Sequence, residues 1–104
     1  MIRINVVTKN IIIESVTLKG HANYDDYGKD IVCAAVSATY LCTVNAILSL
    51  KNNSIDVVNK EDLQIIKVLE FSNITNSLLD NMINCLESLQ KQYPKNINLD
   101  KEEK

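Results

Sequence analysis

Residues 31–50 read "IVCAAVSATYLCTVNAILSL" and predict one long helix without a charged side chain. Asp30 stands directly before this stretch, and an aspartate there caps a helix because its carboxylate accepts hydrogen bonds from the free N–H groups of the first turn. "KNNS" at residues 51–54 ends the helix. Because it is apolar nearly all round and rich in small side chains, we expect it to pack on more than one side. Its own sheet would cover one side, and a partner subunit or the same subunit would cover the rest.

Two strands are predicted before this helix. Residues 2–8 alternate apolar and polar side chains, which is typical of a strand with one buried face. Lys9 and Asn10 break the pattern, and asparagine tolerates the left-handed conformation of tight hairpins. Residues 11–19 read as the returning strand. Neither face of this strand is cleanly polar, so we expect it to lie inside the sheet.

The second half of the chain repeats the same rhythm. Residues 55–59 and 63–71 predict another hairpin, and Ser72 or Asn73 caps an amphipathic helix that Pro94 ends. Residues 97–99 could form a short last strand, and residues 101–104 read as a charged tail. The order ββαββα(β) predicts an α+β fold, with an antiparallel or mixed sheet of four to five strands and two helices. We expect residues 1–100 to form a single domain.

The overall composition narrows the classes of partner. Thirteen acidic and eleven basic side chains are mixed along the 104 residues, and the formal net charge is −2. This balance argues against direct nucleic-acid binding, which usually needs a clustered positive field. The amino terminus shows no secretory signal, and we expect no segment to approach the length of a membrane span. These features favour a cytoplasmic protein with no membrane partner.

The three cysteines are an odd number without a CxxC pair, so neither a disulfide framework nor a zinc site is suggested. We expect no metal and no cofactor. Cys42 and Cys85 are predicted to be small core residues, because neither has a histidine or a glycine-rich turn nearby. Cys33 differs, since "GHANYDDYGKD" at residues 20–30 holds the only histidine and both glycines of the chain.

The junction between this loop and the helix can activate a thiol. With Asp30 as the cap, Cys33 lies in the first turn, where the positive end of the helix dipole favours a thiolate. An imidazole beside it would accept the thiol proton, and any such base must be His21. The N–H groups around Cys33 could hold an oxyanion that forms on an attacked carbonyl. Asp30 could orient the imidazole instead of, or as well as, capping the helix.

Other residues of the loop and helix could support the same site. Ser37 lies one helical turn after Cys33 and shares its face. Gly20 and Gly28 are predicted hinges, because they bracket a segment that could swing as a lid over a bound peptide. The possible substrate-binding residues are three tyrosines, Tyr24, Tyr27 and Tyr40.

Each of these residues also has an ordinary structural interpretation. A free cysteine among alanine and valine is usually a core residue, and a lone histidine at a strand end is usually a surface or capping residue. Asp30 by itself is a cap, and single glycines form turns. Only the coincidence of these residue types at one junction favours catalysis.

The string Gly20-His21-Ala22, then Gly28, then "DIVCAAVSA" at residues 30–38, resembles the ribosomal-processing cysteine protease family of bacteria. The resemblance extends over residues 2 to about 99. It implies that Cys33 is the nucleophile and His21 the base, with Asp30 and Ser37 at the supporting positions of the family.

The resemblance also implies a homodimer and an endopeptidase activity. The substrate would be the short N-terminal extension of large-subunit ribosomal protein number twenty-seven, cut after an aromatic residue. Without substrate, His21 and Cys33 could stand too far apart to bond. Two other classes compete with this interpretation: a non-catalytic ribosome-assembly or peptide-binding module on the same fold, and a thiol redox or metal-binding protein.

Overall fold

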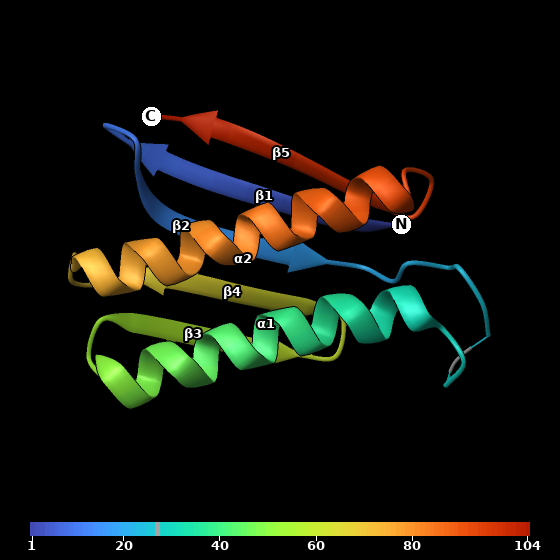
Figure 1. Ribbon diagram of the computed structural model, residues 1–104, viewed down its shortest axis with the longest axis horizontal. Helices are drawn as coiled ribbons and strands as arrows, with labels where there is room; N and C mark the ends of the chain where they lie inside the picture. The colour runs from blue at the N-terminus through green and yellow to red at the C-terminus, as the bar shows by residue number, and fades with distance from the viewer. Residues whose placement is uncertain (27) are drawn as a thin grey trace.

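The computed structural model describes residues 1–26 and 28–104. Its elements follow one another in the order that the sequence predicts (Figure 1). The strands and helices are β1 (Ile2–Lys9), β2 (Ile12–Lys19), α1 (Ile31–Leu50), β3 (Ile55–Lys60), β4 (Leu63–Val68), α2 (Asn73–Gln92) and β5 (Ile97–Glu103).

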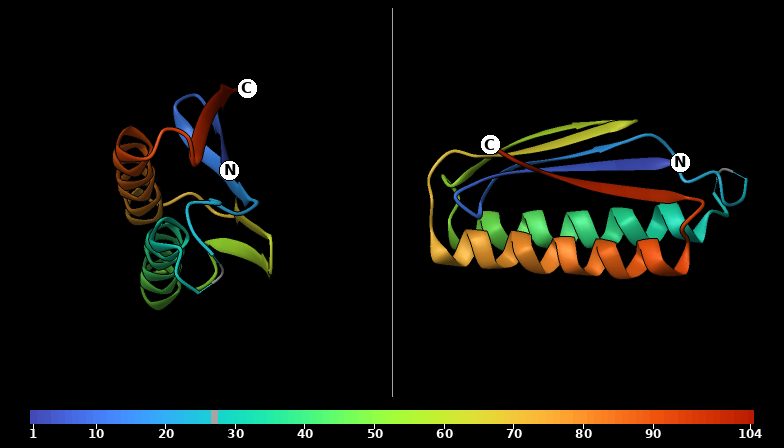
Figure 2. Two further views of the ribbon diagram at one scale, coloured as in Figure 1. Left: turned by 90° about the vertical axis from the view of Figure 1, so that its right-hand side faces the viewer. Right: turned by 90° about the horizontal axis from the view of Figure 1, so that it is seen from above.

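The five strands form one sheet in the order β3-β4-β2-β1-β5. Neighbouring strands are antiparallel except β1 and β5, which are parallel, so the sheet is mixed. β2 lies inside the sheet between β4 and β1, as its two apolar faces predict. Both helices cover the same face of the sheet, side by side and running in opposite directions, and the fold has two layers (Figure 2).

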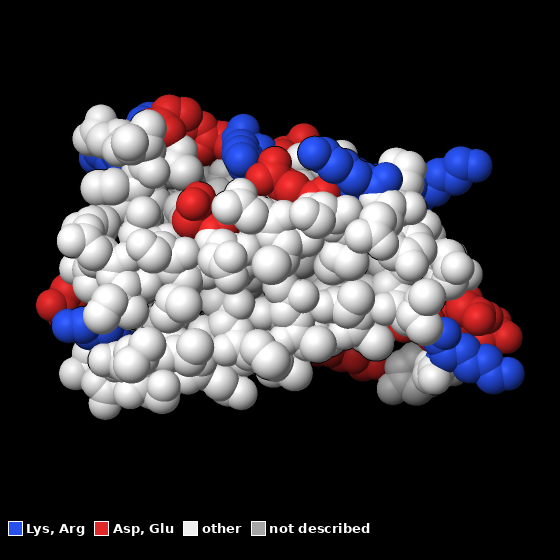
Figure 3. Space-filling view, in the orientation of Figure 1, with Lys and Arg blue, Asp and Glu red and all other residues white. Residues whose placement is uncertain are grey.

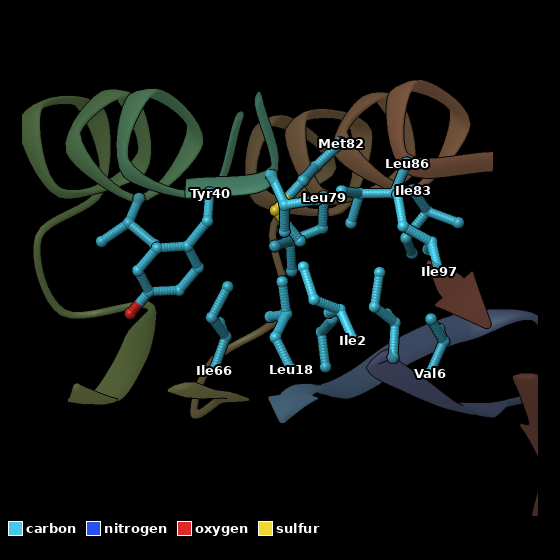
Figure 4. Close-up of a cluster of buried hydrophobic side chains, with 14 of the residues drawn as sticks. Ile2, Val6, Leu18, Tyr40, Ile66, Leu79, Met82, Ile83, Leu86 and Ile97 are labelled. Carbon is cyan, nitrogen blue, oxygen red and sulfur yellow. The ribbon is translucent and has the colours of Figure 1, made fainter. Parts of the chain in front are cut away.

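The core fills the space between these layers (Figure 4). The inward side chains of the strands include Val6, Leu18 and Ile66, and those of α2 include Leu79 and Leu86. Burying a side chain of this size stabilises the fold by about 1.5–3 kcal/mol relative to an exposed one. α1 buries a stripe with helical spacing, formed by Val32, Val36, Tyr40, Val44 and Ile47.

β1 and β3 each run one residue beyond the prediction, and larger differences occur at the start of β2 and the end of β4. Asn10 and Ile11 both have positive φ, of 52° and 63°, and form the two-residue turn between β1 and β2. Ile11 therefore belongs to the turn, where its side chain is 87% exposed. β4 ends at Val68, before Leu69 and Phe71, whose side chains are exposed.

The end of the chain also departs from the prediction. Residues 101–104 were expected to form a solvated tail, but β5 continues to Glu103 and pairs with β1 as far as Thr8. The Thr8 hydroxyl donates to the Glu103 carboxylate and lowers the pKa of that carboxyl. The side chains of residues 100–104 are exposed and charged, so their composition resembles a tail although their backbone pairs.

α1 corrects two further expectations. It is long and apolar enough to cross a membrane, although no segment was expected to approach that length. Length and composition are weak grounds for a membrane span, since the core helix of a globular domain satisfies the same test. Cys42 on α1 and Cys85 on α2 are exposed, not in the core, because each lies outside the buried stripe of its helix.

The face that the two helices present to solvent is largely uncharged (Figure 3). The surface over α1 carries no charged side chain, and charged groups gather along one edge and at the ends of the molecule. Three of the large apolar side chains exposed on this face are Ile31, Leu41 and Leu48. This is more exposed apolar surface than the stripe-and-polar pattern of an ordinary surface helix provides.

Candidate active site

Asp30 caps α1 as predicted and also fastens the preceding loop to it. One carboxylate oxygen accepts from the backbone N–H groups of Val32 and Cys33, both at 3.0 Å. The other oxygen accepts from Tyr24 at 2.9 Å and Asp25 at 3.4 Å. One side chain therefore satisfies donors of the helix and of the loop at the same time.

These contacts govern the ionisation of Asp30. Burial is the largest single influence and by itself raises the pKa of the carboxyl. The four backbone N–H donors together outweigh burial and hold the pKa below the ordinary value of an aspartate. Asp30 is thus a carboxylate at neutral pH.

The same contacts bear on the oxyanion site expected at the start of α1. The N–H groups of Val32 and Cys33 are occupied by the Asp30 carboxylate, and Ala34 donates to the Asp30 carbonyl at 3.1 Å. These groups are three of the four donors that the start of α1 would offer to an anion, the fourth being the N–H of Ile31. In this structure the three N–H groups of Val32, Cys33 and Ala34 donate to Asp30.

Cys33 lies half-buried in the first turn of α1, and its sulfur accepts a hydrogen bond from the N–H of Ala22 at 3.2 Å. Ala22 is 1% exposed, and its carbonyl accepts from the Asn96 side chain at 2.9 Å. Ala22, which follows His21, is therefore bonded through its N–H to α1 and through its carbonyl to the turn before β5. An N–H donor and a helix N-terminus both stabilise negative charge on a sulfur atom.

His21 lies just beyond the end of β2, and its Nε2 is 2.6 Å from a carboxylate oxygen of Asp62. Asp62 belongs to the turn between β3 and β4, and its backbone carbonyl accepts from Gly20 at 2.9 Å. The two side chains are half exposed, with 50% of His21 and 63% of Asp62 accessible. No hydrogen bond joins His21 to Cys33, both of which are among the described residues.

Asp62 is the residue that the sequence analysis missed. It is far from His21 in the sequence and has no motif around it, so it resembles any acidic residue in a hairpin turn. Only the pairing of β2 with β4 could have located it, because Lys19 lies opposite Leu63. Asp30, the other candidate partner of the imidazole, makes no hydrogen bond to His21 among the described residues, and both of its carboxylate oxygens accept from backbone N–H groups.

His21, Asp30 and Cys33 line a pocket of about 610 Å³ between the end of the sheet and the start of α1. Figure 1 shows that residues 20–26 and 28–30 lie at the same end of the molecule as the N-terminus and the turn before β5. Apolar side chains, among them Ile2, Leu18 and Val36, contribute to the lining. Six of the predicted residues also line it, namely Gly20, His21, Gly28, Asp30, Cys33 and Ser37.

Neither Tyr24 nor Tyr40 lines this pocket. Tyr24 is exposed and packs edge-on against Tyr93, with 5.4 Å between ring centroids. Tyr40 is buried in the core, and its hydroxyl has no hydrogen-bond partner among the described residues. Burial also raises the pKa of the Tyr40 phenol. Tyr40 was therefore wrongly proposed for substrate, since it points to the sheet, and Tyr27 lies outside the described residues.

The two glycines differ in their surroundings. Both have positive φ, 95° at Gly20 and 85° at Gly28, which other residues rarely adopt. A Cβ at Gly20 would lie 2.7 Å from the carbonyl oxygen of Met1, so the close approach of the Met1 backbone requires glycine there. A Cβ at Gly28 would meet nothing within 4 Å. Gly20 thus has a packing role besides the hinge role that the sequence suggested.

Among residues 1–26 and 28–104, no three histidine, cysteine or acidic side chains gather in a way that could hold a metal ion. The chemistry that the described groups offer is that of a thiol, an imidazole and a carboxylate beside a pocket. This combination is typical of nucleophilic acyl transfer.

Comparisons with known proteins agree with this chemistry. Residues 1–98 match the family model described as cysteine protease Prp. The ribosomal processing cysteine protease Prp of Staphylococcus aureus (strain Mu50) is 33% identical over 91 residues, which cover 84% of this chain and 85% of that protein.

Two solved structures extend the similarity to the fold. The essential ribosomal processing protease Prp from S. aureus, in complex with a covalently linked product peptide, superposes with a TM-score of 0.94 at 27% identity and covers 98% of this chain and 100% of that one. The S. aureus protease in complex with a substrate peptide superposes with a TM-score of 0.82 at 26% identity, with the same coverage.

Proposed function

Because the chain belongs to the Prp family of cysteine proteases, we propose that it is an endopeptidase acting on a ribosomal protein through a dyad of Cys33 and His21. The substrate is the short N-terminal extension of large-subunit ribosomal protein number twenty-seven. The observation that carries this proposal is the junction at the start of α1. At this junction the only histidine of the chain and the half-buried thiol of Cys33 line the same pocket, which lies between the capped start of α1 and the end of β2.

The reaction begins with the removal of a proton from Cys33. His21 takes this proton, and the thiolate attacks the carbonyl carbon of the scissile peptide bond. The electron pair of that carbonyl moves to its oxygen, which becomes an oxyanion. When this oxyanion collapses, the imidazolium protonates the leaving amine and a thioester remains. His21 then removes a proton from a water molecule, and the resulting hydroxide attacks the thioester carbonyl. The bond to sulfur breaks, the acid product leaves, and the Cys33 thiolate recovers its proton from the imidazolium.

The oxyanion needs a donor, and the N–H of Ala22 is suited to this role. In the free enzyme it bonds the sulfur of Cys33 at 3.2 Å. During the attack, negative charge moves from that sulfur to the neighbouring carbonyl oxygen. The donor loses its acceptor at the moment when a new anion forms beside it, so it can turn to the oxyanion.

The exposed apolar face of α1 supports a homodimer. Ile31, Leu41 and Leu48 lie on a helix without charged side chains, where a second copy would remove them from water. Sedimentation of the purified chain should give twice the monomer mass, and Leu41→Lys should give the monomer. A wild-type monomer at micromolar concentrations would contradict this part of the proposal. The dimer would act in the cytoplasm, where ribosomal proteins are made.

The test of the activity is a digestion followed by mass spectrometry. A synthetic peptide spanning the extension and the mature start of the ribosomal protein is incubated with the wild type, Cys33→Ala or Cys42→Ala. The last variant is the matched control, because Cys42 is an exposed thiol on the same helix. We expect one cut by the wild type and by Cys42→Ala, and none by Cys33→Ala. A peptide that binds the wild type and stays intact would indicate a non-catalytic binding module.

A further inference from the structure

The imidazole of His21 has a carboxylate partner that does not belong to the loop carrying the site. Its Nε2 lies 2.6 Å from Asp62, which is within the range of a strong charge-assisted hydrogen bond. The two residues are far apart in the sequence and come from different hairpins. This contact depends on how the sheet is assembled.

The sheet places both residues by its hydrogen-bond ladder. β2 and β4 pair as far as Lys19 and Leu63, and the next bond beyond the ladder joins the Gly20 N–H to the Asp62 carbonyl at 2.9 Å. His21 follows that bonded residue directly. The pairing of β2 with β4 therefore fixes the backbone next to His21 and the backbone of Asp62. Because both backbones are fixed, the two side chains are held close to each other.

The competing carboxylate, Asp30, is already occupied. Both of its oxygens accept from backbone N–H groups, two in the helix and two in the loop. If the Asp30 side chain turned toward the imidazole, the N–H donors of the loop and of the start of α1 would lose their acceptor. The structure thus divides two tasks between two acidic residues: Asp30 orders the loop and the nucleophile, and Asp62 faces the base.

We propose that Asp62 is the positioning residue of the catalytic base, so that the site works as Cys33, His21 and Asp62. This inference rests on the proposed function. The Asp62 carboxylate accepts a hydrogen bond from the Nε2–H of His21. Nδ1 is then the unprotonated nitrogen that can take the proton from Cys33. After that transfer the carboxylate faces an imidazolium and stabilises its charge, while Asp62 itself gains no proton.

The kinetic test compares Asp62→Asn with the wild type on the peptide that the wild type cuts. Both partners are half exposed, so solvent weakens the contact and we expect a loss of about 10- to 100-fold in kcat, with KM within about 2-fold. Asp62→Glu should recover part of the loss. Asp56→Asn is the matched control, since it removes an exposed carboxylate from the same hairpin, and it should leave both parameters unchanged.

A spectroscopic measurement tests the orientation without any turnover. The chain has one histidine, so the ¹⁵N signals of its imidazole belong to His21 without further assignment. In the neutral wild type these signals should report the proton on Nε2. Asp62→Asn should populate the other tautomer, because an amide can donate to Nε2 as well as accept from it. Asp56→Asn should leave the wild-type pattern.

The outcomes separate this inference from the proposed function. A wild type that cuts, together with an Asp62→Asn variant of equal or greater kcat, would overturn the role of Asp62 and leave the protease proposal standing. A slower variant with an unchanged tautomer would also overturn it. If the wild type cuts nothing, the protease proposal fails, and the tautomer ratio still decides whether Asp62 orients His21.

Discussion

Replacing Asp30 by alanine should destabilise the whole chain as well as the site. The substitution removes the N-cap of α1, which costs about 1 kcal/mol. It also removes the two hydrogen bonds to the loop, and these contribute about 1 kcal/mol together because one of them is long. The expected loss in the free energy of unfolding is therefore about 2 kcal/mol, or about 10 °C in Tm for a domain of this size.

The cap and the loop contacts can be measured separately. Asp30→Asn keeps a good N-cap, since an asparagine oxygen accepts from the helix N–H groups, but its amide nitrogen cannot accept from the loop. It should lose about half as much stability as Asp30→Ala. Asp26→Ala removes an exposed carboxylate from the same loop and serves as the control. The measurement is denaturant unfolding followed by circular dichroism.

The pH dependence has a definite sign. Because the Asp30 pKa is lower in the folded chain than in the unfolded chain, the stabilisation is complete above the unfolded-state pKa, about 3.9. It is lost as the pH falls through the folded-state pKa. The difference between the wild type and Asp30→Ala should thus be constant near neutral pH and shrink below about pH 4. The reasoning would be refuted if Asp30→Ala were no less stable than Asp26→Ala at pH 7.

Three further substitutions test individual features of the fold. Ile11→Gly should raise the free energy of unfolding by about 1 kcal/mol, because a β-branched residue is strained at the positive φ of this exposed turn; a destabilised variant in urea unfolding would contradict this. Gly20→Ala should cost about 2 kcal/mol or more, since its Cβ would meet the Met1 carbonyl at 2.7 Å; a thermal midpoint equal to the wild type would show that the Met1 backbone can move aside. Tyr40→Phe should be neutral or stabilising by about 1 kcal/mol, because it removes a buried hydroxyl without a partner. A clear loss in calorimetry would indicate a partner for that hydroxyl.

The sequence by itself determined the features that depend on neighbours along the chain. Asp30 caps α1 through N–H groups two and three residues away, so its role could be recognised from spacing alone. The order of strands and helices followed from periodicities of two and of 3.6 residues. The grouping of Gly20, His21 and Cys33 within one short stretch likewise pointed to the pocket that they line.

Only the tertiary structure decided the features that arise from contacts across the sheet. The position of β5 beside β1 brings residues 101–103 into a strand, although their charges resemble a tail. The sequence could not show which side chains of α1 face the sheet, because a helix that is apolar all round has no preferred face, and this is why Tyr40 was misplaced. The meeting of Asp62 with His21 has the same origin. It requires β2 and β4 to pair in one register, and register is set by packing of whole strand faces, which no short motif records.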